Sequence, residues 1–254
     1  MRRSDERPTG AFSVITISKD DPPGLARTLA SIARQSVMPE AIVLVRSGTS
    51  RDLSVDAALA ARTVEVADPG LGISAAFNAA IAASQGEWLV FLNGGDAFSR
   101  PDSLAILAEA CSEAPAPDIV ACRARTDAGV MIPYIVPRRL PDYLFISHQA
   151  SAFRRTLFGD IGPYSPRFRV RMDLDWMARY LQEKGAARIC FVDRSIVDYT
   201  LDGISSTNLV DFYTEEFRVL RRSTRFLSAL LGLLVRRLPE RLLREALRAV
   251  ARRR

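Results

Sequence analysis

Short β-rich runs alternate with longer helical patterns through the first half of this chain. The β-rich runs are largely apolar and β-branched: residues 12–17, 41–45, 63–66, 87–92 and 119–122. Apolar residues at helical spacing lie between them, as in Ile73, Phe77 and Ile81. This alternation predicts an α/β fold with a mainly parallel sheet and helices on both of its faces. Ligands of such sheets bind beyond the carboxyl ends of the strands, so the loops after the first four strands should surround a site.

Positive charge is concentrated at the carboxyl end of the chain. The 254 residues carry a net charge of +6, and residues 218–254 hold twelve Arg and two Glu, a balance of +10. The rest of the chain is therefore mildly acidic, at −4. An acidic body argues against a nucleic-acid groove on the domain, so we expect no nucleic-acid partner.

The carboxyl-terminal segment has the pattern of basic amphipathic helices. An apolar patch within residues 226–235 is flanked by arginines, and Pro239 separates it from a second amphipathic stretch at 241–254. We therefore divide the chain into a domain at 11–207 and a helical extension at 208–254. The extension suits binding to an anionic membrane surface. A helix packed on the domain, with its basic face in solvent, is the alternative.

Several features favour a cytoplasmic protein. The first ten residues are polar and lack the apolar region of a signal peptide. The longest apolar stretch has ten residues, which is too short to span a bilayer. The three cysteines have neither zinc spacing nor close pairing, which favours a reducing compartment. We expect a cytoplasmic location, and a peripheral position at the inner face of the cell membrane wherever the extension binds there.

A candidate metal loop follows the fourth predicted strand. The segment Phe91-Leu-Asn-Gly-Gly-Asp96 leaves an apolar run, and its two glycines let the backbone approach a ligand closely. Asp96 is a candidate ligand, because Mg²⁺ and Mn²⁺ prefer oxygen and are often held by one or two carboxylates together with substrate phosphates. An ordinary turn is the alternative reading, since Asn, Gly and Asp are common turn residues.

A second candidate lies in Arg171-Met-Asp-Leu-Asp-Trp176, at the start of a helix predicted from near Asp173 to Gly185. Asp173 and Asp175 are two residues apart, so they do not share a helix face. One can cap the helix while the other points elsewhere. A plain helix cap at Asp173 is the alternative reading.

The two candidate segments, together with five others in a fixed order along the chain, resemble the family 2 glycosyltransferases of the GT-A fold, of the bacterial polysaccharide-assembly type. The resemblance spans about residues 11–207. Its segments are residues 12–18, 29–32 with Gln35, 72–78, 85–96, 147–154, 168–176 and 201–206. No single motif is specific, but their ordered set is.

The resemblance implies roles for particular residues. Asp96 would hold a Mg²⁺ or Mn²⁺ cofactor that bridges the donor diphosphate, and Asp173 would be the general base of an inverting transfer. The donor side would comprise Ile17, Ser18, Gly48, Asn78, Asn93, Gly94 and Gly95. The acceptor side would comprise His148, Gln149, Asp175 and Trp176. As the sole histidine, His148 can equally be structural.

The same resemblance implies the partners. A sugar would move from a nucleotide-diphosphate donor to a saccharide or lipid-linked acceptor in surface polysaccharide biosynthesis. The chain departs from the family at Val45-Arg-Ser-Gly-Thr-Ser50, where Arg46 replaces a carboxylate of the nucleotide loop, and at Ala75, where Asp is frequent. Asp20, Asp21 and Asp68 lie close enough in sequence to compensate.

Two other classes of protein remain open. The lost acids also suit a non-catalytic GT-A-like partner in a polysaccharide assembly complex, although such a chain has little reason to keep both Asp96 and Asp173. Gly70-Leu-Gly-Ile-Ser-Ala75 matches a dinucleotide fingerprint. It follows the third strand rather than the first, and its acidic partner is missing, which argues against an oxidoreductase.

Overall fold

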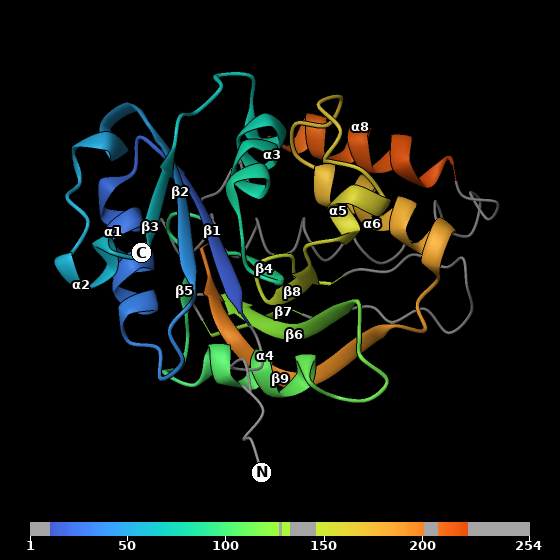
Figure 1. Cartoon of the computed structure of the whole chain (residues 1–254). Helices are drawn as coiled ribbons and strands as arrows, with labels where there is room; N and C mark the ends of the chain where they lie inside the picture. Colours follow the sequence, from blue (N-terminus) through green and yellow to red (C-terminus); the bar gives the residue numbers. More distant parts are fainter. Residues whose placement is uncertain (1–10, 127–128, 133–145, 201–207, 223–254) are drawn as a thin grey trace, which may run out of the picture.

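A nine-stranded sheet forms the centre of the computed structural model (Figure 1). The structure describes residues 11–126, 129–132, 146–200 and 208–222. The strands are β1 (Phe12–Lys19), β2 (Ala41–Ser47), β3 (Thr63–Val66), β4 (Trp88–Phe91), β5 (Ala97–Phe98), β6 (Ile119–Thr126), β7 (Met131–Ile132), β8 (Ser151–Arg154) and β9 (Ile189–Tyr199). All five strands that the sequence predicts are present, as β1 to β4 and β6.

The described helices are α1 (Pro22–Ala33), α2 (Ala57–Ala60), α3 (Ile73–Ala83), α4 (Ser103–Cys111), α5 (Leu157–Asp160), α6 (Met172–Lys184) and α8 (Leu209–Leu220), with a short 3₁₀ turn, η1 (Gly48–Asp52). Helix α1 begins where the sequence indicates. The Asp21 side chain accepts a hydrogen bond from the Gly24 N–H, and proline occupies the first turn, where its missing N–H costs nothing.

The strand order is β3-β2-β1-β4-β8-β6-β9-β5, with β7 beside β6. Strands β3, β2, β1 and β4 are parallel, so their carboxyl ends meet at one edge. Strand β8 is antiparallel to both of its neighbours, β4 and β6, whereas β6 and β9 are parallel to each other. The predicted α/β fold with a mainly parallel sheet is confirmed.

Helices cover both faces of the sheet, as predicted (Figure 1). One core joins β1 and β2 to α1, α2 and α4, for example through Leu25, Leu59 and Leu107. The other core joins the opposite face to α3, α5 and α6, for example through Phe77, Phe158 and Trp176. Inward-facing side chains of the strands supply both cores, because successive strand residues point to opposite faces.

Helix α8 lies against α6, next to the second core (Figure 1). Phe212, Val219 and Leu220 of α8 are buried. The domain boundary that we predict between residues 207 and 208 thus falls just before a helix that packs on the body of the protein. That division stays a prediction, and the amphipathic stretches after residue 222 lie outside the described residues. In the described part of the chain, no helix is long and apolar enough to cross a membrane.

Candidate active site

The loops after β1 and β2 are joined by hydroxyl groups. The Ser18 hydroxyl lies 2.9 Å from that of Ser50, and the Asp21 N–H donates to Ser50 Oγ at 2.9 Å. The Thr49 N–H donates to the Asp20 carboxylate at 3.0 Å. Asp20 and Gly48 both have left-handed backbones, with φ of 54° and 57°. This tight crossing places Ser18 and Gly48, both predicted on the donor side, at the same edge of the sheet.

Arg46, near the end of β2, faces β3. Its guanidinium pairs with the Glu65 carboxylate at 2.5 Å and also donates to the Leu53 carbonyl. Leu44 and Glu65 are register partners across the two strands, so this ion pair reinforces the β2–β3 edge. The arginine is thus engaged in a structural contact.

Asp68 supplies a carboxylate at the carboxyl edge of the parallel strands. It follows β3, and its carboxylate accepts a hydrogen bond from the Gly70 N–H at 3.0 Å. That bond, the Ser47 hydroxyl and the positive charges of Lys19 and Arg51 lower the pKa of Asp68, whereas partial burial raises it. Asp68 is therefore ionised at neutral pH and lies beside the ends of β1 and β2.

The turn after β4 passes very close to the end of β1. The Gly94 N–H donates to the Ile17 carbonyl at 2.9 Å, and a Cβ on Gly94 would lie 2.7 Å from Ser18 Oγ. Gly95 has φ of 97°, which favours glycine. The two glycines are therefore required by a close approach and by a left-handed backbone. Ile17, Ser18, Gly94 and Gly95, all predicted on the donor side, thus lie together and form one cradle.

A buried hydroxyl on α1 fixes this turn. The Thr28 hydroxyl donates a hydrogen bond to the Asp96 carbonyl at 2.6 Å and accepts one from the Gly95 N–H at 3.1 Å. Ser31 and Gln35 follow on the same face of α1. Ser31 Oγ accepts from the Phe98 N–H, and the Gln35 side chain binds the backbone at residues 100 and 104. Thr28 has no role predicted from the sequence, although polar residues at this helical spacing on a buried face are a usable signal.

Asp96 is a buried carboxylate, only 3% exposed. Its Oδ1 accepts a hydrogen bond from the Thr200 N–H at 2.9 Å, and the Arg27 guanidinium, which donates to the Gly95 carbonyl at 2.8 Å, lies close by. Burial raises the pKa of Asp96 to about 7, against the opposing effects of the Thr200 N–H and of Arg27. A carboxylate kept out of water in this way is stabilised by a bound cation.

The described residues contain no group of three or more His, Cys, Asp or Glu side chains that could hold a metal ion. One further oxygen is notable, however. Asn93 Oδ1 is buried and has no hydrogen-bond partner among the described residues. Asn93 and Asp96 belong to the same turn, in which the Asp96 N–H donates to the Asn93 carbonyl at 3.0 Å. One carboxylate and one amide oxygen suit a hard cation that takes its other ligands from substrate phosphates.

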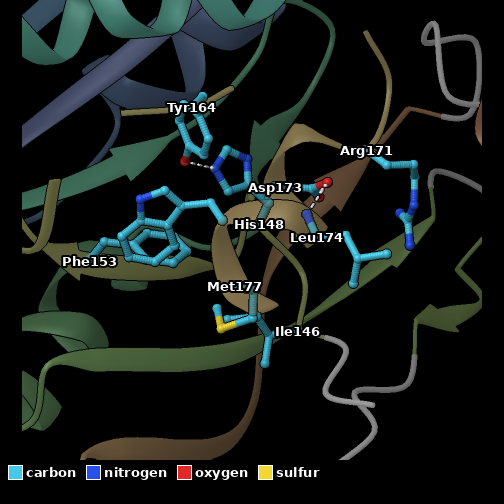
Figure 2. Close-up of a pocket in the computed structure, with 9 residues that line it drawn as sticks. Ile146, His148, Phe153, Tyr164, Arg171, Asp173, Leu174 and Met177 are labelled. Carbon is cyan, nitrogen blue, oxygen red and sulfur yellow. Dashed lines mark hydrogen bonds between the residues drawn. The ribbon is translucent and has the colours of Figure 1, made fainter. Parts of the chain in front are cut away.

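A second group of predicted residues lines a pocket at the start of α6 (Figure 2). Its lining residues are Ile146, His148, Phe153, Tyr164, Arg171, Asp173, Leu174, Trp176 and Met177. Asp173 lies in the first turn of α6, and the helix cap is Arg171, so the reading of Asp173 as the cap is wrong. Asp173 Oδ1 accepts from the Leu174 N–H at 2.8 Å. Its carboxylate faces the pocket, with His148 and Tyr164 on one side (Figure 2).

Some predicted site residues are engaged in structural contacts. The Asn78 amide both donates to and accepts from the backbone of Tyr164, at 2.9 Å each. The Trp176 indole donates to the Gly162 carbonyl and stacks on Phe158. Asn78 and Trp176 therefore hold the segment that leads into α6, and Trp176 also forms part of the pocket wall.

Asp175 and Gln149 differ from the other acceptor-side residues. Asp175 is 2% exposed and pairs with Arg179 at 3.2 Å and with Arg222 at 2.8 Å. It faces this ion-pair network, and it is not among the residues that line the pocket. Gln149 is half-buried in the turn before β8 and does not line the pocket either.

His148 is enclosed by aromatic rings. Its Nε2 lies 2.8 Å from the Tyr164 hydroxyl, and its ring stacks on Phe91 with centroids 4.4 Å apart. Burial lowers the pKa of His148 to about 4, although the negative charge of Asp173 opposes this shift. The imidazole is therefore neutral at pH 7. It packs among the aromatic rings and also lines the pocket, and its acceptor-side role stays a prediction.

We expect the stability contribution of His148 to be lost on acidification. The folded-state pKa near 4 lies below the unfolded value of 6.5, so the unfolded chain takes up the proton first as the pH falls. Compared with His148→Gln, the wild type should lose about 3 kcal/mol of unfolding free energy between pH 7 and pH 4. Urea denaturation of both proteins across this range measures the difference. Parallel pH profiles would contradict the burial of a neutral imidazole.

Together, the fold and the site define a class. A mainly parallel α/β sheet carries a glycine cradle and a buried carboxylate at the carboxyl ends of its strands, and a second carboxylate lies in a pocket beside them. This is the GT-A arrangement of a sugar-transferring enzyme. The chain belongs to glycosyl transferase family 2, whose pattern matches residues 13–170.

Relatives support this assignment. A PGL/p-HBAD biosynthesis glycosyltransferase of Mycobacterium bovis is 31% identical over 242 residues, which are 90% of this chain and 91% of the relative. The protein is therefore a glycosyltransferase, and the oxidoreductase and non-catalytic alternatives are not supported.

Solved structures share the fold. The 1-349 form of S. aureus TarS, in complex with UDP-GlcNAc, superposes with a TM-score of 0.62 at 20% identity, covering 82% of this chain and 65% of that one. The mannosyltransferase PcManGT from Pyrobaculum calidifontis, in complex with GDP-Man and Mn2+, has a TM-score of 0.59 at 14% identity, covering 87% and 64%. The chain spans less than two thirds of either solved protein.

Proposed function

We propose that this glycosyltransferase moves a sugar from a nucleoside-diphosphate donor to a hydroxyl of a saccharide or lipid-linked acceptor, with inversion at the anomeric carbon. The observation that carries the proposal is Asp173, whose carboxylate faces a pocket at the start of α6. The acceptor hydroxyl oxygen would attack the anomeric carbon while Asp173 takes its proton, and the nucleoside diphosphate would leave with the bonding electrons.

The donor side of the proposal rests on the cradle at the ends of β1, β2 and β4. Gly94 and Gly95 let the backbone come close to a diphosphate, and Asp96 and Asn93 would hold Mg²⁺ or Mn²⁺. The cation, when bound, would neutralise charge on the leaving diphosphate. Asp68, ionised at the same edge, is the carboxylate that would take the place of the one lost at Arg46 and hydrogen-bond the nucleoside.

Donor turnover tests this proposal. The intact protein is incubated with UDP-GlcNAc or GDP-mannose and Mn²⁺, and release of the nucleoside diphosphate is measured with and without EDTA. We expect turnover of at least one donor and its loss on chelation. Turnover that is unchanged in EDTA would show that the reaction does not need a divalent cation. An α-configured product from an α-configured donor, seen by NMR, would remove inversion.

We also infer that the protein acts at an anionic membrane surface in surface polysaccharide assembly. The support is the arginine-rich composition of residues 218–254, most of which lie outside the described residues. We expect the intact chain to sediment with anionic liposomes at low salt and a chain truncated after Arg222 to remain in the supernatant. Equal sedimentation of both proteins would contradict membrane binding through the carboxyl-terminal segment.

A further inference from the structure

Helix α8 brings two buried acids to the segment that carries Asp173. Glu215 is 3% exposed and Glu216 is fully buried. A buried carboxylate is costly unless it is paired or hydrogen-bonded, so the contacts of these two residues show what α8 does in the fold.

Glu215 binds three successive backbone N–H groups. Its carboxylate accepts from Arg169 at 2.8 Å, from Val170 at 2.9 Å and from Arg171 at 2.9 Å. Hydrogen bonds from N–H groups to an ionised carboxylate are about twice as strong as neutral ones. These residues directly precede α6, so Glu215 fixes the backbone two residues before Asp173.

Other contacts from α8 and the residues just after it hold both flanks of Asp173. Before it, the Arg171 guanidinium lies 3.5 Å from the Glu216 carboxylate and 4.4 Å from the Phe212 ring centroid. After it, Asp175 pairs with Arg222 at 2.8 Å. Asp173 therefore lies between two anchor points that come from one helix and its end.

The start of α6 is fixed from outside the helix. Its cap, Arg171, has no side-chain capping bond, and the Arg171 N–H donates to the Glu215 carboxylate at 2.9 Å. Within the described residues, the Asp173 carboxylate accepts one hydrogen bond, from the Leu174 N–H to Oδ1. Oδ2 can therefore face the pocket.

We propose that Glu215 is a positioning residue that sets the orientation of Asp173 by holding the N–H groups of residues 169–171. The proposal rests on the base role of Asp173 given above. A misplacement of about 1 Å at a reacting group can cost about a hundredfold in rate, so a carboxylate that fixes the backbone two residues before Asp173 can change the rate strongly.

A double-mutant cycle tests the inference, with the donor that the turnover assay identifies. Glu215→Gln keeps the size of the side chain and removes its charge and one acceptor oxygen. We expect kcat to fall about 10- to 100-fold, with the KM for the donor unchanged. On the Asp173→Asn background, Glu215→Gln should have no further effect, because the group that it positions is already gone. Glu183→Gln, on the exposed face of α6, is the matched control and should leave kcat unchanged.

The outcomes separate the two proposals. Full activity of Asp173→Asn would reject the base role itself. If Asp173→Asn is inactive but Glu215→Gln lowers the rate equally on both backgrounds, or raises the donor KM, then Glu215 acts on the fold in general and the positioning role is overturned. Should Glu215→Gln fail to fold, Glu215→Asp, which keeps the charge but shortens the side chain, replaces it in the same cycle. Faster amide exchange at residues 169–171 in the Glu215 variant would show directly that the anchor is lost.

Discussion

Asp173→Asn should lower kcat about a thousandfold while leaving the affinity for the donor nucleotide unchanged. Asparagine has the same shape as aspartate but cannot take a proton from the acceptor hydroxyl. Its amide oxygen can still accept the Leu174 N–H, so the first turn of α6 should persist. The donor cradle at Ser18 and Gly94 belongs to other elements and should be unaffected.

Rates with saturating donor and acceptor, together with calorimetric titration of the nucleoside diphosphate, measure the two parts of this expectation. Asp160→Asn makes the same chemical change at a half-exposed ion pair with Lys184 and serves as the control. Loss of nucleotide binding in Asp173→Asn would place that residue on the donor side. A rate within a few-fold of the wild type would assign the base to another group.

The first half of the fold follows from local pattern alone. Strands β1 to β4 are short apolar runs bounded by polar residues or by glycine and proline, and the helices between them have regular apolar spacing. The second half departs from such patterns. Strands β5 and β7 have two residues each, and β9 pairs with β6 through register shifts, so long-range pairing decides where these strands lie.

The candidate site divides in the same way. Asp96 and Asp173 are candidates from sequence because one follows a predicted strand and the other lies at the start of a predicted helix, and the ordered resemblance assigns their roles. The contacts of Thr28 and Glu215 cannot be predicted in this way, because their partners lie about 67 and 45 residues away in the chain. Asn78 and Asp175 show the opposite case, in which a residue predicted in the site makes structural contacts. The family pattern places them in the site, yet the structure engages them with the Tyr164 backbone and with two arginines.

Asp96→Asn should make the ligand-free protein more stable at pH 8 and abolish its stabilisation by donor nucleotide and Mn²⁺. Burial raises the pKa of Asp96 to about 7, above its ordinary value of 3.8. The wild type therefore loses stability as the pH rises from about 4 through 7, whereas the neutral asparagine does not. We expect the variant to gain about 2–4 kcal/mol of unfolding free energy at pH 8 in EDTA.

With nucleoside diphosphate and Mn²⁺ at about a hundred times their dissociation constant, the wild type should gain about 2.7 kcal/mol and the variant should gain nothing. Denaturant titration at pH 8, with and without ligands, measures both effects, and Asp160→Asn should follow the wild type. If Asp96→Asn raises the unfolding free energy without ligands but lowers it relative to the wild type with them, the Asp96 carboxylate destabilises the free protein and is needed for cation binding. A variant that is destabilised in EDTA would instead assign Asp96 to holding Thr200 in place, since the Thr200 N–H is its hydrogen-bond donor.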